Sequence, residues 1–434
     1  MRRLPFTRLQ EAVLYVERSH TPWNIQLEVA TAATLDLDRL GAAARTACGT
    51  YPMARARCRE RGGDGPPFEW VVPDGAPGVP ITAVDAGEAD GFRRRFYGSR
   101  VDLASEPPLA LLVARGDGTD GGDRLCLRAS HVPMDGIGAV RVLQTLLAAY
   151  RGEDPPAARL EATPRDVLAG ARPEGLARRL RLLGRTARRF GFFLDSPAAV
   201  QGGASDAAGW PGWRFAHRHL DAGTTSRLLA DRPPGVTVND VLLAALHLTI
   251  DRWNAARGDP ASRISLMMPM NVRPGDAFYD GVGMYTLFDS VDTEPSHRRD
   301  AAAALERVAD RTGAIKAAGS QFGYLEWWRL FSAVAPPSVR SRVPPLVFGP
   351  GEPMLDTAVL SNLGRLPPLP GLTDGDVERP WLTPPAWPPT PLSVGVLTAG
   401  DRLHLGFRYE RSVFDADDAA AFADRYRERV ESMA

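Results

Sequence analysis

The chain has 434 residues, of which 44% are hydrophobic, so it can bury a large core and is long enough for two domain-sized units. Acidic and basic residues balance at 52 each, which excludes an overall charge that would draw the chain to nucleic acid or to an acidic membrane. The three cysteines lack CxxC spacing, and their odd number makes a poor disulfide framework. Because the N-terminus lacks a signal-peptide pattern and no apolar run could span a bilayer, we expect a soluble, cytoplasmic protein.

Residues 1–165 mix strand and helix patterns and are predicted to form an N-terminal subdomain. Polar and apolar residues alternate in residues 24–30, as in a half-buried strand, whereas residues 37–48 have helical spacing. A second alternating segment, residues 123–131, precedes a helix that we expect to begin near Ile137. This part of the chain is therefore expected to be mixed α/β.

Residues 166–210 are predicted to hold a helix and a connector. Residues 174–194 have the pattern of an amphipathic helix, with leucines on one side and arginines on the other. The arginines of that face are Arg178, Arg181, Arg185 and Arg188. They could meet an acidic carrier protein, the phosphates of coenzyme A or a membrane surface, or they could form an ordinary solvated face. The Gly/Ala/Ser stretch in residues 201–213 can bury little and is predicted to connect the two halves.

Residues 211–434 are predicted to form a second α/β subdomain, whose first helix would be capped by Thr237 or Asn239. Its expected helices and strands occupy residues 237–256, 297–318 and 416–431 (helices) and 263–272 and 390–410 (a strand and a strand pair). The proline-rich stretch of residues 365–391 is predicted to be a long loop.

One histidine, His131, stands at the end of the strand predicted for residues 123–131, four residues before Asp135. Successive side chains of a strand point to opposite faces, so Ser130 and His131 are not expected to form a nucleophile and base pair. Pro133 and Gly136 place His131 and Asp135 on a strand-to-helix turn, which argues against a metal site, and GxSxG, HExxH and GxxxxGK[ST] motifs do not occur. His131 could thus be a structural histidine or a catalytic base.

The segment SHVPMDG, residues 130–136, resembles the HHxxxDG motif of the condensation-type acyltransferase superfamily. Companion motifs follow the order of that superfamily: TPWNIQLEV, TVNDVLLAAL, MPMNVRPGD, GVGMY and SNLG. The superfamily includes nonribosomal peptide condensation domains, wax ester synthase/diacylglycerol acyltransferases and polyketide-associated acyltransferases. The resemblance implies an α/β fold of two chloramphenicol-acetyltransferase-like subdomains, which form a pseudo-dimer around a central tunnel.

The resemblance also implies roles for the residues of the main motif. The second motif histidine is the general base and corresponds to His131, and the motif aspartate corresponds to Asp135. Asp135 would be structural and would pair with Arg273 across the two halves, while Gly136 would allow a tight turn behind the base. Losing one partner of a buried pair is expected to harm folding more than chemistry.

Candidates for substrate binding, from the same resemblance, are Ser130, Ser361, Asn362 and Tyr285. Asn362 could donate its amide to an oxyanion, as could the backbone near Gly136, or Asn362 could be a turn residue that bonds its own backbone. No metal site is expected.

Two positions depart from the superfamily pattern. Ser130 replaces the first motif histidine, and Gly283-Met284 stands where Gly-Asn is usual. A DFGWG segment, which marks peptide-synthetase condensation domains, has no clear match, and this weakens a peptide-bond-forming interpretation.

The resemblance favours an acyltransferase that moves an acyl group from a thioester to an alcohol. The thioester of coenzyme A or of a carrier-protein phosphopantetheine would be a co-substrate, and no bound cofactor is expected. Two alternatives stay open: a free-standing enzyme that acylates an amine, and a non-catalytic module that recruits a carrier protein or another enzyme. A lipid substrate would add a peripheral membrane contact.

Overall fold

The computed structural model describes ten segments of the chain. They are residues 1–19, 21–61, 67–155, 163–172, 174–191, 196–202, 212–343, 355–372, 379–387 and 389–434. The predicted connector lies largely outside these segments, and so does the end of the helix predicted to reach residue 194.

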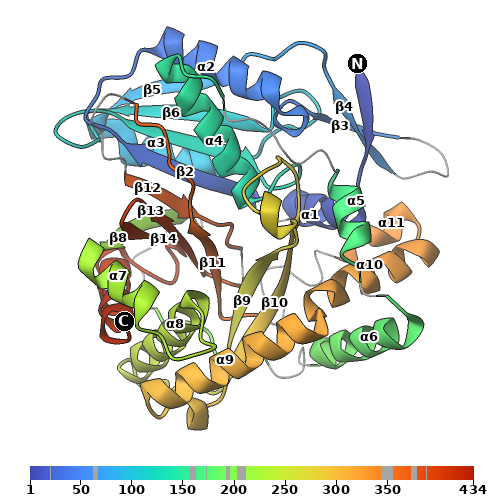
Figure 1. The fold of residues 1–434 in the computed structure, drawn as a ribbon, viewed down its shortest axis with the longest axis vertical. Helices are drawn as coiled ribbons and strands as arrows, with labels where there is room; N and C mark the ends of the chain where they lie inside the picture. Colours follow the sequence, from blue (N-terminus) through green and yellow to red (C-terminus); the bar gives the residue numbers. More distant parts are fainter. Residues whose placement is uncertain are drawn as a thin grey trace.

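The N-terminal half is built on a five-stranded sheet in the order β12-β2-β7-β6-β5, with a small sheet β1-β4-β3 beside it. Its elements are β1 (Arg2–Pro5), α1 (Arg8–Ser19), β2 (Asn24–Ala30), α2 (Leu37–Thr50), β3 (Arg57–Glu60), β4 (Phe68–Val72), β5 (Ile81–Asp85), α3 (Ala86–Gly98), β6 (Leu109–Arg115), β7 (Arg124–Ser130) and α4 (Gly136–Arg151). Helices α2 and α4 lie together over one face of the five-stranded sheet (Figure 1).

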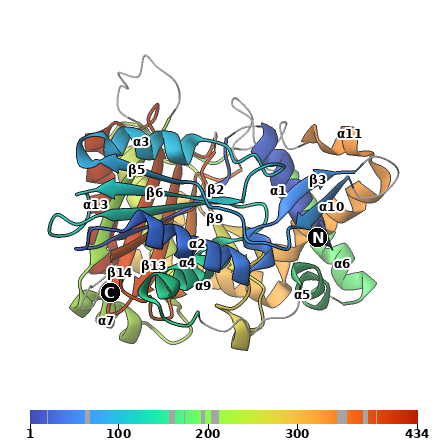
Figure 2. The ribbon, with the colours of Figure 1, turned by 90° about the horizontal axis from the view of Figure 1, so that it is seen from above.

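The C-terminal half is built on a six-stranded sheet in the order β10-β9-β11-β13-β14-β8. Its strands are β8 (Trp213–Leu220), β9 (Ile264–Asn271), β10 (Thr286–Thr293), β11 (Ala358–Arg365), β13 (Leu392–Ala399) and β14 (Arg402–Glu410). Its helices are α7 (Ala222–Ala230), α8 (Val238–Ala255), α9 (Ala301–Ala318), α10 (Gly323–Val334), α11 (Pro337–Arg340) and α13 (Ala416–Ser432). Figure 2, seen from above, shows this half beneath the N-terminal sheet, with α1 and α10 at one end.

Along the chain, the two halves are separated by α5 (Pro164–Gly170) and α6 (Leu176–Gly191), and α6 packs against α10. Leu182 of α6 and Trp328 of α10 are buried in the hydrophobic core of the N-terminal half, whereas α8, α9 and α13 pack in a separate core. Of the two predicted caps of α8, Thr237 is the observed one, because its hydroxyl accepts the Asp240 N–H in a capping box. None of the described helices is long and apolar enough to cross a bilayer.

The prediction of a half-buried strand at residues 24–30 was wrong, because all seven residues of β2 are buried. Strand β2 pairs with β7 on one edge and with β12 on the other. Its polar residues are enclosed as well: Glu28 forms an ion pair with Arg93 of α3 at 2.7 Å, and Gln26 accepts a hydrogen bond from Thr383 of β12. The alternation of polar and apolar residues thus predicted the strand correctly, but its polar face is covered by charged and polar partners rather than by solvent.

The prediction of a continuous loop at residues 365–391 was also wrong, since this stretch contains β12 (Arg379–Thr383). β12 comes from the C-terminal segment but pairs antiparallel with β2 of the N-terminal sheet (Figure 1). It is an edge strand, where a proline such as Pro380 costs little because the outer edge needs no donor. The two halves are thus joined by a shared strand.

Two glycines allow β12 to lie close to the C-terminal sheet. Gly395 of β13 and Gly406 of β14 are opposite each other in the antiparallel pair. A Cβ atom on either residue would clash with the backbone carbonyl of Leu382 in β12. The small side chains at this pair therefore let the crossing strand pass over the sheet.

We predict that Gly406→Ala lowers the free energy of unfolding by about 1–3 kcal/mol, the usual cost of forcing extra atoms into a packed site. Gly313→Ala is the matched control, because Gly313 lies within α9 and a Cβ there meets no neighbouring atom. That substitution should raise stability by roughly 0.5–1 kcal/mol. Denaturant unfolding measures the change in unfolding free energy for each variant. Equal changes in the two variants would contradict the proposed packing of β12.

Candidate active site

His131 follows directly after β7 and is held there by the backbone. Its N–H donates to the carbonyl of Trp23 at 2.8 Å, which extends the pairing of β7 with β2. The chain then turns into α4, whose N-cap is Asp135: a carboxylate oxygen accepts the Gly138 N–H at 2.9 Å. A sheet strand and a capped helix therefore fix the turn that carries His131.

The structure brings Asp135 and Arg273 together as the resemblance implied. Arg273 Nη1 lies 2.8 Å from Asp135 Oδ2, and Nη2 lies 2.8 Å from Oδ1, so the guanidinium binds the carboxylate with two parallel hydrogen bonds. Both side chains are inaccessible to solvent, with exposed fractions of 0% and 1%. The pair joins the N-terminal half to the loop that follows β9.

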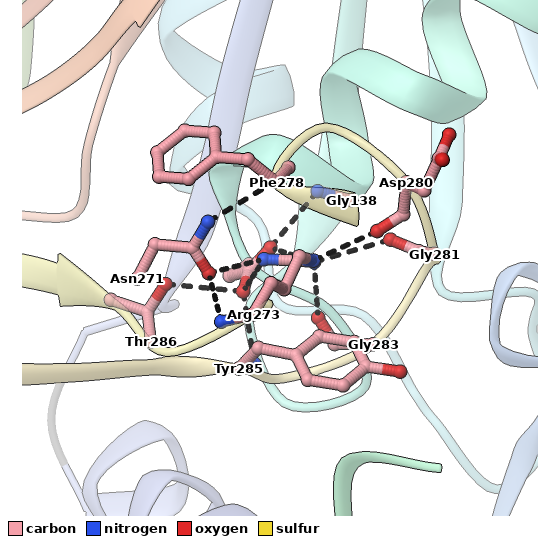
Figure 3. Close-up of polar contacts among 10 residues, drawn as sticks. Gly138, Asn271, Arg273, Phe278, Asp280, Gly281, Gly283, Tyr285 and Thr286 are labelled. Atoms are coloured by element: carbon pink, nitrogen blue, oxygen red, sulfur yellow. Dashed lines mark hydrogen bonds and ion pairs between the residues drawn. The ribbon is translucent and has the colours of Figure 1, made fainter. Parts of the chain in front are cut away.

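Further hydrogen bonds satisfy both members of this pair (Figure 3). Asp135 Oδ2 also accepts the Tyr285 N–H at 2.9 Å and the Thr286 hydroxyl at 3.1 Å. Arg273 donates to Asn271 Oδ1 at 3.1 Å and to the carbonyls of Asp280 and Gly281, and its guanidinium lies 4.2 Å from the centre of the Tyr285 ring. Burial alone would raise the pKa of Asp135, but the charge and hydrogen bonds of Arg273 outweigh it and hold the pKa below its usual value.

Gly136 is confined by packing rather than by backbone conformation. It is not among the glycines with positive φ, but a Cβ there would lie 3.2 Å from Leu363 of the SNLG segment. Gly283 is confined in a similar way between Pro164 and the Tyr285 ring, and its carbonyl accepts the Asp135 N–H at 3.0 Å. The glycines of these motifs therefore let the segments around His131 approach one another closely.

A cavity of about 510 Å³ lies between the two halves, and His131 is part of its wall. Its other walls come from α1, from β9 to β11, from α10 and from the segment after β12, and they are mainly apolar. The aromatic lining residues are Trp23, Phe278, Tyr279, Phe288, Tyr324, Trp327, Trp328 and Trp387. Such a cavity, apolar with a few polar groups, is typical of a small-molecule site.

The candidate substrate-binding residues divide into two pairs. Ser361 and Asn362 line the cavity. Asn362 Oδ1 accepts the Gly364 N–H at 2.9 Å, so the residue does support its own turn, and its amide NH2 remains available as a donor. Ser130 and Tyr285 do not line the cavity: Tyr285 packs against Arg273, and Ser130 is fully buried on the other face of β7. The prediction that they bind substrate is therefore not supported by their positions.

Ser130 instead has a partner on α1. Its hydroxyl donates to Glu17 Oε2 at 3.3 Å and accepts the Val132 N–H at 3.3 Å. Burial raises the pKa of Glu17 to about 7, which the hydrogen bond from Ser130 partly opposes. Ser130, which replaces the first histidine of the HHxxxDG pattern, thus makes a polar contact between β7 and α1 next to His131.

Several lining residues were missed by the sequence analysis. The adjacent Trp327 and Trp328 belong to α10, and Met284, one of the two departures, presents its side chain to the cavity. Lys316, at the end of α9, also lines it. The tryptophan pair was a visible signal, but apolar residues on a helix usually mark core packing.

The environment of His131 favours its neutral form. Burial lowers the pKa of His131 below 6.5, and the negative charge of Asp135 opposes this only in part. A neutral imidazole at pH 7 has a free lone pair and can accept a proton. Among the described residues no cluster of three potential metal ligands occurs.

No protein-family model matches the chain, but a curated relative does. The uncharacterized protein Rv2305 of Mycobacterium tuberculosis is 31% identical over an alignment of 448 positions, gaps included, which covers 98% of this chain and 99% of the relative. The chain belongs to the same family as Rv2305.

Solved structures show which fold this Rv2305 family member has. The cyclization-docking bidomain of EpoB from Sorangium cellulosum matches with a TM-score of 0.69 and 17% identity, over 99% of this chain and 84% of the other. The first condensation domain of the CDA synthetase matches at 0.67 and 17%, over 99% and 96%. A mutant starter condensation domain of rhizomide synthetase RzmA, in complex with C8-CoA, matches at 0.66 and 14%, over 99% and 94%. The fold is that of the condensation and cyclization domains in these structures, as the motifs predicted.

We predict that Arg273→Met lowers the free energy of unfolding by about 3–5 kcal/mol, because it leaves the Asp135 carboxylate buried without its counter-charge. Arg94→Met is the matched control, since Arg94 pairs with the exposed Asp90 one turn away on α3. An exposed pair contributes only about 0–1 kcal/mol. Denaturant unfolding of both variants makes the comparison, and a loss at Arg273 no larger than that at Arg94 would refute the role given to the buried pair.

Proposed function

We propose that this chain is an acyltransferase that moves an acyl group from a thioester to an alcohol, with His131 as the general base. The observation that carries the proposal is the position of His131, on a rigid turn at the wall of a largely apolar cavity between the two halves. The complex of the RzmA domain with C8-CoA supports an acyl thioester as donor.

In the proposed reaction, neutral His131 accepts the proton of the acceptor hydroxyl while its oxygen attacks the thioester carbonyl. The tetrahedral intermediate then collapses, the carbon–sulfur bond breaks and the imidazolium returns the proton to the departing thiolate. The products are an ester and a free thiol, and no acyl-enzyme is formed. Because β7 and the Asp135 cap fix the turn, the backbone that carries the imidazole is already held in place before the reaction.

The oxyanion of the intermediate needs a hydrogen-bond donor near His131. Asn362 lines the same cavity, and because its Oδ1 is occupied by the Gly364 N–H, its NH2 group is the part that can donate. We assign this role to Asn362 ahead of the backbone near Gly136. Ser361 lies next to it on β11 and also lines the cavity.

The lining of the cavity supports an apolar acyl group. Leu9, Val13 and Val16 of α1 face it from one side and Trp327 and Trp328 of α10 from another. Each methylene transferred from water to such a wall contributes about 0.8 kcal/mol, so a long acyl chain would bind more tightly than an acetyl group.

Two alternatives differ in their need for a base. An enzyme that acylates an amine would use His131 in the same way, whereas a non-catalytic module that recruits a partner would need no base.

We predict that His131→Ala lowers turnover by about 10²–10⁴-fold, the usual contribution of a general base, and leaves the fold intact. The measurement is release of free thiol from an acyl-coenzyme A donor in the presence of an alcohol. His219→Ala is the matched control, because His219 is exposed on β8 and does not line the cavity.

The pH dependence separates a base from a merely structural histidine. The neutral form is the active one, and the pKa of His131 lies below 6.5, so wild-type kcat/KM should be level at pH 7 and fall only below pH 6.5. The residual activity of His131→Ala should lack this fall. A folded variant that keeps both its turnover and the wild-type pH profile would exclude His131 as the base.

A further inference from the structure

A second cavity, of about 460 Å³, lies between α6, α9 and the strands β9 and β10. Most of its lining residues are polar or charged, and five of them are arginines, whereas the first cavity is lined mainly by apolar residues. The charged lining residues are Arg185, Arg188, Arg263, Arg307, Arg311, Asp289 and Asp292. Nothing in the proposed reaction at His131 uses these residues.

The acidic groups of this cavity are already engaged by neighbours. Arg307 Nη2 and Arg311 Nη2 lie 3.1 and 2.8 Å from the carboxylate of Asp292. Asp289 accepts the Ser290 N–H at 2.8 Å and the hydroxyl of Ser320. The cavity therefore keeps an excess of positive charge.

Two of its arginines come from α6 and are exposed. Arg185 and Arg188 form no ion pair with any residue in the described segments. The helix itself is firmly placed: Leu182 and Thr186 are buried, and Gly323 of α10 leaves no room for a Cβ against the Thr186 side chain. The two guanidinium groups are thus carried to the cavity by a packed helix, which favours binding of a ligand over random solvation.

A buried hydroxyl points to a missing partner at the same place. Ser290 of β10 lines the cavity and is only 3% exposed. Its Oγ has no hydrogen-bond partner among the residues that the structure describes. A buried hydroxyl without a partner is costly, so a ligand acceptor in this cavity would satisfy it.

The two cavities adjoin each other at Tyr324 of α10, which lines both. The Tyr324 ring stacks on Phe288 with 4.8 Å between ring centres, and Phe288 belongs to the wall of the apolar cavity. The two cavities therefore share a wall, and a ligand with an anionic end and an apolar end that reached both would pass along Tyr324.

We propose that the second cavity binds the phosphate of the pantetheine arm of the thioester donor. The inference rests on the proposed function, which requires such a donor. Arginine suits phosphate because its planar guanidinium donates two hydrogen bonds to two oxygens. The same phosphate is present in coenzyme A and in a carrier-protein phosphopantetheine.

The test measures binding, so it does not depend on acyl transfer. Wild-type protein is titrated calorimetrically with 4′-phosphopantetheine and with pantetheine, which differ only in the phosphate. We expect the phosphorylated probe to bind at least about tenfold more tightly, and added salt to reduce the difference. In Arg185→Glu/Arg188→Glu this preference should be lost.

Arg178→Glu/Arg181→Glu is the matched control, because it makes the same charge change on exposed residues of α6 that do not line the cavity. It should keep the wild-type preference. A wild-type protein that binds both probes equally or neither, or an Arg185→Glu/Arg188→Glu variant that keeps the preference, would overturn the proposal.

Coenzyme A as a third probe identifies the source of the phosphate. Tighter binding than 4′-phosphopantetheine means that the nucleotide also contributes, as expected for a coenzyme A donor. Equal binding means that only the single phosphate is recognised, as expected for a carrier protein. If phosphate binding is present but no acyl transfer is detected, the proposed function fails and this site stands.

Discussion

A buried carboxylate from the N-terminal half, Asp135, is bound by two hydrogen bonds from the guanidinium of Arg273 in the C-terminal half, and the histidine turn depends on this contact. The same carboxylate caps α4 and accepts the Tyr285 N–H, so one charged group fixes a helix start, a loop and the interface between the halves. Desolvation makes such a pair a weak source of stability, but a strong constraint on geometry, since each partner is costly to bury alone.

The cavity exists because the two halves meet only partly. Strand β12 joins the sheets at one end, and the pair of Gly395 and Gly406 lets it lie close to both. Toward α1 and α10, the halves enclose a space with apolar walls, and His131 lies at its edge. A largely apolar space strengthens the electrostatic interactions of the groups that line it, because its local dielectric constant is lower than that of water.

The contact of Asp135 with Arg273 was predictable, because both residues belong to motifs whose order implied the fold. The cavity wall could not be predicted, because the residues of α1 and α10 that form it have the same apolar pattern as residues of a hydrophobic core. Strand β12 was missed because it is short, contains a proline and pairs with β2, which is distant in the sequence. Ser130 and Tyr285 were candidates because they belong to the motifs, but neither lines the cavity: Ser130 bonds Glu17, and Tyr285 packs against Arg273.

Ester formation by the wild-type protein can be measured directly by mass detection of the acylated product. Octanoyl-coenzyme A is a suitable donor, offered together with a panel of alcohols and amines, and free thiol is quantified in parallel. We expect an ester with at least one alcohol, formed in equal amount to the thiol released. Thiol release without an acylated acceptor, or amide formation with no ester across the panel, would contradict the proposed function.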